Sequence, residues 1–143
     1  MALNRSLKNR RPILPRSAKN KGAAFQKKIA KIIAQLLELE PSEMGYGDDC
    51  LIKPKRMGEK GVDIHIDKSV RKRFPIASEC KNSVGASVPA TIKQVLPYVS
   101  DGYKYWMCFM KLKQHRKPVV IMELDLFEKI MESAKPIEEK TWK

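Results

Sequence analysis

Hydrophobic residues along this chain recur with two different periods, which predict helices and strands in alternation. From residue 21 to about residue 39, apolar residues recur three and four positions apart, which indicates an amphipathic helix with Asn20 as its cap. The predicted apolar stripe consists of Phe25, Ile29, Ile32, Ile33, Leu36 and Leu37. A loop rich in glycine and acidic residues follows at residues 40–49.

Short apolar runs farther along the chain predict five strands. Their expected ranges are residues 50–53, 62–66, 76–81, 103–110 and 118–124. In the second run Val62, Ile64 and Ile66 alternate with polar residues, which is typical of a strand buried on one face. Polar or basic turns are expected at residues 55–60, 69–74 and 114–117.

Two more helices are predicted between and after these strands. One spans about residues 89–100, with Ser87 as its cap and Asp101-Gly102 as its stop. Pro97 is expected to kink this helix or end it early, because proline removes a backbone hydrogen bond. The last helix spans residues 125–134. This order predicts an α/β fold in which helices flank a central mixed β-sheet.

Length and charge distribution divide the chain into three parts. A flexible basic arm is expected at residues 1–18, one folded domain at 19–135 and a tail at 136–143. The formal net charge is +13, and residues 1–21 hold seven basic residues and no acidic one. Such a basic arm is typical of a protein that binds a polyanion, although a solubilising tail has the same composition.

Membrane and zinc-binding classes are not favoured by this sequence. No run of about 18 apolar residues is present, so we expect a cytoplasmic protein with no membrane partner. The three cysteines are far apart and lack the Cys-x-x-Cys spacing of a zinc site. Buried reduced thiols are therefore expected.

Candidate chemistry is concentrated on two neighbouring predicted strands. Asp63 lies near the start of one, and Glu79 and Lys81 lie on the next, two residues apart and therefore on the same face. Two carboxylates and an ammonium group suit phosphodiester hydrolysis assisted by Mg²⁺, with Mn²⁺ as a substitute. An ordinary ion pair on an exposed strand is the alternative, but the apolar neighbours Ile76 and Ala77 favour burial.

Each group has an expected role in this metal-dependent reaction. Asp63 and Glu79 are the expected metal ligands, with the backbone carbonyl of Cys80 as a third. Lys81 is expected to orient or deprotonate the attacking water and to offset negative charge.

These residues resemble the motifs of the PD-(D/E)xK nuclease superfamily, and in particular the Holliday-junction resolvases of archaeal and phage type. The similarity covers about residues 20–134 and is carried by residues 21–26, 57–63 and 74–82. Gln94 and Tyr98 resemble the Gln-x-x-x-Tyr motif of several related nucleases. The resemblance implies a restriction-endonuclease-like core and a homodimer that cleaves four-way or other branched DNA, in the cytoplasm of a bacterial host for a phage protein.

The resemblance also extends the set of candidate residues. Gln26 stands where many such resolvases have a catalytic glutamate, and it is equally compatible with packing at the edge of the apolar stripe. The serine that archaeal members place before the metal-binding aspartate is missing here, so its role is either absent or filled by Lys55, Arg56 or Lys60. Expected DNA contacts are Arg10, Arg11, Arg16, Lys19, Lys21, Lys55, Arg56, Lys60, Gln94 and Tyr98.

Two other functions are compatible with the same sequence. One is a restriction or repair nuclease that acts on duplex or flapped DNA. The other is a non-catalytic nucleic-acid-binding protein on the same fold.

Overall fold

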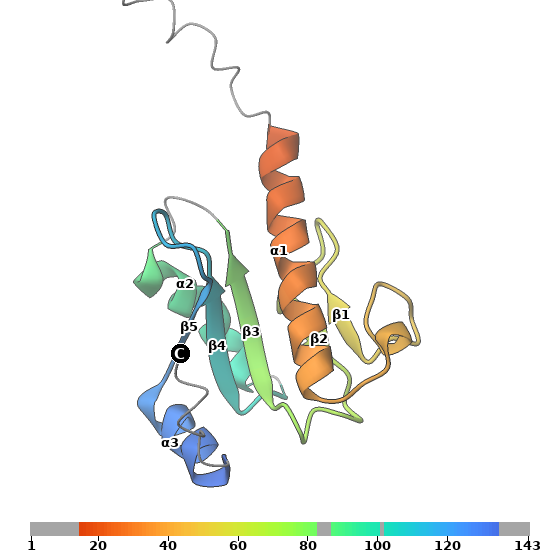
Figure 1. The fold of residues 1–143 in the computed structure, drawn as a ribbon, viewed down its shortest axis with the longest axis vertical. Helices are drawn as coiled ribbons and strands as arrows, with labels where there is room; N and C mark the ends of the chain where they lie inside the picture. The colour runs from red at the N-terminus through yellow and green to blue at the C-terminus, as the bar shows by residue number, and fades with distance from the viewer. Residues whose placement is uncertain (1–14, 83–86, 101, 135–143) are drawn as a thin grey trace, which may run out of the picture.

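A central mixed sheet flanked by helices forms the core of the protein, which confirms the predicted α/β class (Figure 1). The computed structural model describes residues 15–82, 87–100 and 102–134. Within these ranges the elements are α1 (Pro15–Leu36), η1 (Pro41–Glu43), β1 (Ile52–Pro54), β2 (Ile64–Ile66), β3 (Ile76–Lys81), α2 (Val88–Val95), η2 (Leu96–Ser100), β4 (Tyr105–Met110), β5 (Val119–Met122) and α3 (Leu124–Ser133).

The five strands lie in the sheet in the same order as in the sequence. Strands β3 and β4 are parallel, and the other neighbouring pairs are antiparallel. Parallel neighbours need a crossover connection, and α2 supplies it between β3 and β4. Because β3 has β2 on one side and β4 on the other, it is a central strand of the sheet.

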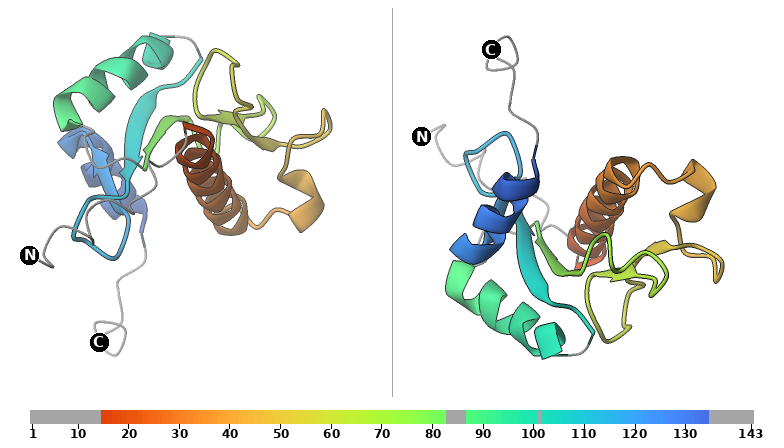
Figure 2. Two further views of the ribbon diagram at one scale, coloured as in Figure 1. Left: turned by 90° about the horizontal axis from the view of Figure 1, so that it is seen from above. Right: turned by 90° about the horizontal axis from the view of Figure 1, so that it is seen from below.

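Helices α1 and α2 cover opposite faces of the sheet (Figure 2). Helix α1 packs on β1 and β3, and α2 packs on β3 and β4. The strand β3 is therefore enclosed on both faces, and its first five residues, Ile76 to Cys80, are all buried. Polar side chains on this strand consequently lie inside the protein.

The half of the sheet formed by β1 and β2 is covered on only one face. Ile52 and Ile64 are fully buried, whereas the alternate residue Lys53 is half-buried and His65 is exposed. This alternation is the expected signature of a sheet with one packed face and one open face. The open face of β1 and β2 continues directly into the enclosed strand β3.

Helix α1 begins earlier than the sequence pattern predicts. It starts at Pro15, so the predicted boundary at residue 18 lies inside the helix and Asn20 is not its cap. Proline fits the first turn of a helix, because its missing N–H has no partner there and its φ angle is already helical.

The end of α1 is also earlier than residue 39. Glu38 adopts a left-handed conformation with φ of 57°. The N–H groups of Glu38 and Leu39 donate to the carbonyls of Gln35 and Ala34, each at 3.0 Å. This is a Schellman motif formed without glycine, which explains why no glycine in the sequence marks it.

Helix α2 ends before Pro97, as predicted. The α-helix stops at Val95 and continues as the 3₁₀-helix η2. Ser87 is the N-cap, and its hydroxyl accepts a hydrogen bond from the N–H of Ala90 at 3.0 Å. Strand β3 spans the predicted residues, and the other strands are shorter than predicted. Within the described ranges, no helix is both long enough and apolar enough to cross a bilayer.

Replacing the cap of α2 should measurably weaken the fold. We expect Ser87→Ala to lower the free energy of unfolding by about 1 kcal/mol, because the N–H of Ala90 loses its partner. Ser87→Asp should preserve stability, since aspartate is an equally good cap. Urea denaturation of the three proteins provides the measurement, and equal stability of Ser87→Ala and the parent would contradict it.

Candidate functional site

Asp63 connects three strands through its carboxylate and its backbone. It is buried at the start of β2, with 4% of its surface exposed. Its Oδ1 atom lies 3.0 Å from Nζ of Lys55, and its Oδ2 atom accepts a hydrogen bond from the N–H of Cys80 at 2.8 Å. Its own N–H donates to the carbonyl of Ser78 at 3.2 Å. The carboxylate therefore has a fixed position between β1 and β3.

Glu79 and Lys81 lie on one face of β3, as their spacing predicts. Nζ of Lys81 is 3.3 Å from Oε1 of Glu79. Burial, together with the nearby negative charge of Asp63, raises the pKa of Glu79 to about 7, although the positive charges of Lys81 and Lys55 act in the opposite direction. The two acidic side chains are thus close enough to repel each other inside the protein.

Lys55 joins this cluster through a contact with Asp63 that the sequence analysis did not predict. The sequence suggested a contact with a DNA phosphate or the role of the missing serine, whereas in the structure its Nζ pairs with Asp63 and also donates to the carbonyl of Gly61 at 3.4 Å. Partial burial works to lower the pKa of Lys55, but the hydrogen bond and charge of Asp63, helped by the charges of Glu79 and Tyr98, raise it overall. Lys55 is therefore a charged member of the site.

The pairing of β1 with β2 explains the position of Lys55. Residue pairs Ile52–Ile66, Lys53–His65 and Pro54–Ile64 face each other across the two strands. The same register places Lys55 opposite Asp63, and the N–H of Lys55 donates to the carbonyl of Asp63 at 2.8 Å.

The donor set fits a divalent cation of the Mg²⁺ type. Asp63 and Glu79 provide two carboxylates, and the N–H of Cys80 points toward Asp63. In an extended strand the N–H and C=O of one residue point to the same side, so the carbonyl of Cys80 is directed toward the same carboxylate. Among the described residues, no group of three or more His, Cys, Asp or Glu side chains forms a complete cage. Mg²⁺ suits such an incomplete set, because it retains several waters and accepts substrate phosphates.

The other predicted catalytic residue, Gln26, is not part of this cluster. It is half-buried on α1, and within the described chain it forms no hydrogen bond with Asp63, Glu79 or Lys81. The nearest link between α1 and the end of β3 is a hydrogen bond from Nδ2 of Asn82 to the carbonyl of Lys21 at 3.3 Å. A catalytic role for Gln26 stays a prediction.

Gln94 and Tyr98 are separated by the change of helix type at Val95. Gln94 is exposed on α2, whereas Tyr98 is half-buried on η2. The predicted spacing on a single α-helix is therefore wrong. A role for Gln94 and Tyr98 in DNA binding stays a prediction.

The remaining predicted DNA contacts are distributed around the site and on α1. Arg56 and Lys60 are exposed on the turn between β1 and β2 and line a pocket that also includes Lys55. Lys21 is exposed on α1. Arg16 and Lys19 belong to α1, but their side chains lie outside the described part of the structure, as do Arg10 and Arg11 altogether.

The cysteines near the site are unreactive thiols. Cys80 and Cys108 are buried and form no disulfide. Burial raises the pKa of the Cys80 thiol and raises that of Cys108 to about 11, with the nearby carboxylates adding to the effect. Both thiols are therefore poor nucleophiles at neutral pH.

Comparison with family models, with curated protein sequences and with solved structures gives no match. The interpretation of the site therefore depends on its own geometry.

The raised pKa of Glu79 predicts a pH-dependent stability in metal-free solution. In the folded state the pKa of Glu79 is about 7, above the ordinary value of 4.5 for a glutamate side chain. The stability that the protonated Glu79 gives to the fold is therefore complete below pH 4.5 and is lost as the pH rises through 7. The shift corresponds to at most about 3 kcal/mol, and we expect about 2 kcal/mol after solvent screening. The free energy of unfolding of Glu79→Gln, relative to that of the parent, should therefore be higher at pH 8 than at pH 5.

Urea denaturation at both pH values in the presence of a chelator measures this gain. Glu132→Gln, which changes an exposed glutamate on α3, is the matched control and should follow the parent. A constant difference between Glu79→Gln and the parent at the two pH values would disprove the assignment.

Proposed function

We propose that this protein is a Mg²⁺-dependent DNA endonuclease that hydrolyses phosphodiester bonds in branched DNA, with four-way Holliday junctions as the leading substrate. The observation that carries this proposal is the burial of Asp63 and Glu79 beside each other, with Lys55 and Lys81 in contact. Buried carboxylates that repel each other are costly for a fold, and such clusters are concentrated at functional sites. The resemblance of residues 57–63 and 74–82 to PD-(D/E)xK nuclease motifs supports the same conclusion.

The residues of the cluster have complementary roles in hydrolysis. Asp63, Glu79 and the carbonyl of Cys80 would hold Mg²⁺, which when bound supplies Lewis acidity toward the phosphate and lowers the pKa of water. Lys81 orients the attacking water, whose oxygen forms the new bond to phosphorus as the leaving oxygen departs. The ammonium groups of Lys81 and Lys55 stabilise the negative charge that develops in this step.

The charge of the chain supports DNA as the substrate. A net charge of +13 favours binding to a polyanion, and such binding should weaken steeply as salt increases. Exposed basic side chains flank the cluster on the β1–β2 turn. These groups contact phosphates rather than base edges, so recognition should depend on DNA shape more than on sequence.

Helix α3 supports the proposal of a homodimer. Its side chains Phe127, Ile130 and Met131 are 49%, 37% and 49% exposed, and their spacing places them on one stripe of the helix. A second copy of the chain could cover this stripe through a twofold interface. A twofold dimer would also present two equivalent sites to the two symmetry-related strands of a four-way junction.

A non-catalytic role has one specific observation in its favour. Both carboxylate oxygens of Asp63 already have protein partners, namely Lys55 and the N–H of Cys80. If these partners keep a metal ion from binding to Asp63, the protein would bind DNA without cleaving it. A nuclease with the same site that acts on flaps or linear duplex is the other alternative, and both are separated from the leading proposal by the assay below.

Cleavage of a labelled four-way junction tests the proposed activity. We expect nicking with Mg²⁺ or Mn²⁺, none with a chelator, and a loss of at least about 100-fold in Asp63→Asn, because the metal loses a charged ligand. Lys81→Ala should cause a similar loss. The rate is measured on gels, with flapped and linear duplex DNA as comparison substrates.

Matched controls are available on the same chain. Asp49→Asn changes an exposed loop aspartate, and Lys104→Ala changes an exposed lysine that precedes β4, at the end of the sheet opposite to Lys81. Both should cleave like the parent. Junction binding without metal-dependent cleavage would support the non-catalytic alternative instead.

The dimer interface gives a separate prediction. Phe127→Glu should shift the protein from dimer to monomer, because a charge replaces an apolar side chain in the centre of the α3 stripe. Sedimentation velocity measures the change, and Glu128→Gln on the same helix is the control. A monomeric parent protein would rule out the dimer while leaving the nuclease proposal intact.

A further inference from the structure

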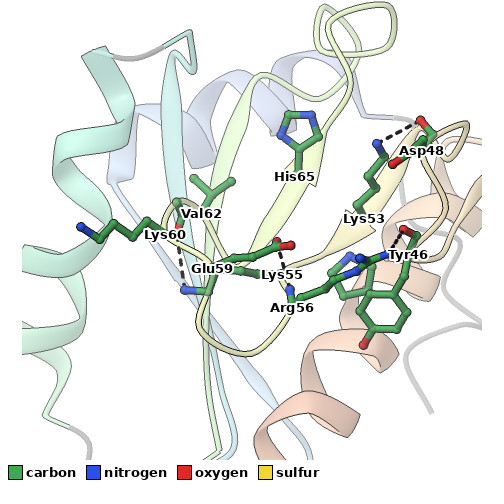
Figure 3. A pocket seen from close by; sticks show the side chains of 11 residues that line it. Tyr46, Asp48, Lys53, Lys55, Arg56, Glu59, Lys60, Val62 and His65 are labelled. Carbon is green, nitrogen blue, oxygen red and sulfur yellow. Dashed lines mark hydrogen bonds between the residues drawn. The ribbon is translucent and has the colours of Figure 1, made fainter.

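A pocket of about 310 Å³ lies beside the carboxylate cluster and shares Lys55 with it (Figure 3). Its lining includes Lys53 of β1 and His65 of β2, which lie directly opposite each other in the sheet. These residues occupy the open face of the sheet, where helices leave β1 and β2 uncovered. The pocket is therefore a direct continuation of the proposed active site.

Backbone carbonyls are the hydrogen-bond partners of two basic side chains in this pocket. Lys53 donates from Nζ to the carbonyl of Asp48 at 3.0 Å, and Arg56 donates from a guanidinium nitrogen to the carbonyl of Tyr46 at 2.7 Å. Backbone carbonyls hold these side chains in place without neutralising them. In the part of the chain that the structure describes, neither Lys53 nor Arg56 forms an ion pair. The pocket also includes Lys60, so basic groups exceed acidic groups in its lining and favour an anion.

One aromatic residue accompanies these cations. Tyr46 lines the pocket and is 37% exposed. Its loop is tied to β1, because the N–H of Gly45 donates to the carbonyl of Ile52 at 3.1 Å. An exposed aromatic ring beside basic groups is the usual arrangement for stacking an unpaired base of a single strand.

The size of the pocket distinguishes a single strand from a duplex. A volume of about 310 Å³ is at the small end of the range for small-molecule sites. It suits one nucleotide and is far too small for a double helix. Phosphate contacts alone would require only a basic surface, whereas this pocket combines basic groups with the side chain of Tyr46.

We propose that this pocket binds one unpaired nucleotide of a DNA strand next to the bond that is cleaved. Lys53 and Arg56 contact its phosphate, and Tyr46 stacks on its base. This inference rests on the proposed nuclease function, since the carboxylate cluster defines where the strand is cut. It narrows the substrate to DNA in which a strand can leave the double helix beside the cut, as at a branch point or a flap, and disfavours uninterrupted duplex.

Binding in the presence of a chelator tests the pocket without cleavage. Fluorescence anisotropy with a labelled oligonucleotide, single-stranded or duplex, gives the dissociation constants for the full-length protein. Tyr46→Ala should weaken single-strand binding about tenfold and duplex binding much less, because only an unpaired base can stack on the ring. Tyr46→Phe should preserve binding, since the ring remains.

The lysine variants test the phosphate contact. Lys53→Ala should weaken single-strand binding and reduce the slope of log affinity against log salt by about 0.7, as expected for one lost contact to a single strand. Lys104→Ala, which changes an exposed lysine outside the lining of this pocket, should leave both values unchanged. Thermal melts of each variant verify that folding is preserved.

The outcomes separate this inference from the proposed function. Equal single-strand binding by Tyr46→Ala, Lys53→Ala and the parent would overturn the pocket assignment even if the protein cleaves DNA. An equal loss of single-strand and duplex binding in Tyr46→Ala would overturn it as well. Selective loss in these variants supports the assignment even if the parent shows no cleavage, in which case the nuclease function alone fails.

Discussion

The contact between Lys55 and Asp63 is the interaction on which the rest of the site depends. It joins the end of β1 to the start of β2, while the second oxygen of Asp63 accepts the N–H of Cys80 on β3. Three strands are thus held in register around one buried carboxylate. Removal of either partner would leave a buried charge or a buried N–H without compensation, which is far more costly than the loss of a surface ion pair.

A buried cluster of carboxylates and lysines adds little to the stability of a fold, but it fixes the positions of the charged groups. Glu79 lies on the enclosed strand β3 beside Asp63, and burial first, then the charge of Asp63, raise its pKa. Apolar residues of similar size would pack at lower cost. The two lysines act as internal counterions to the carboxylates.

Local patterns explain most of the fold that the sequence predicted correctly. Strand β3 spans the expected residues because its apolar run is bounded by Pro75, and α2 stops ahead of Pro97 because proline removes a hydrogen bond. The end of α1 was missed because Glu38, rather than glycine, adopts the left-handed conformation. Nothing in the identity of a glutamate signals that choice, since it follows from how the chain turns back onto the sheet.

The site was predicted in part for the same reason. Two residues on one strand, Glu79 and Lys81, share a face by period alone, and their contact follows. The role of Lys55 was missed because it depends on the register between strands, which the hydrophobic pattern does not specify in a basic turn. Tyr98 lies on the 3₁₀-helix η2 rather than on the α-helix with Gln94, because α2 ends ahead of Pro97.

The unequal coverage of the sheet has a consequence for how this protein can change over time. On β1 and β2, neighbouring residues lie on opposite faces of the sheet. Ile52 and Ile64 pack in the core, whereas Lys53 and His65 face outward. Mutations at the outward positions can change the surface of this face with little penalty to folding, because the adjacent interior contacts are untouched. This half of the sheet can thus diversify more easily than β3, where both faces are enclosed.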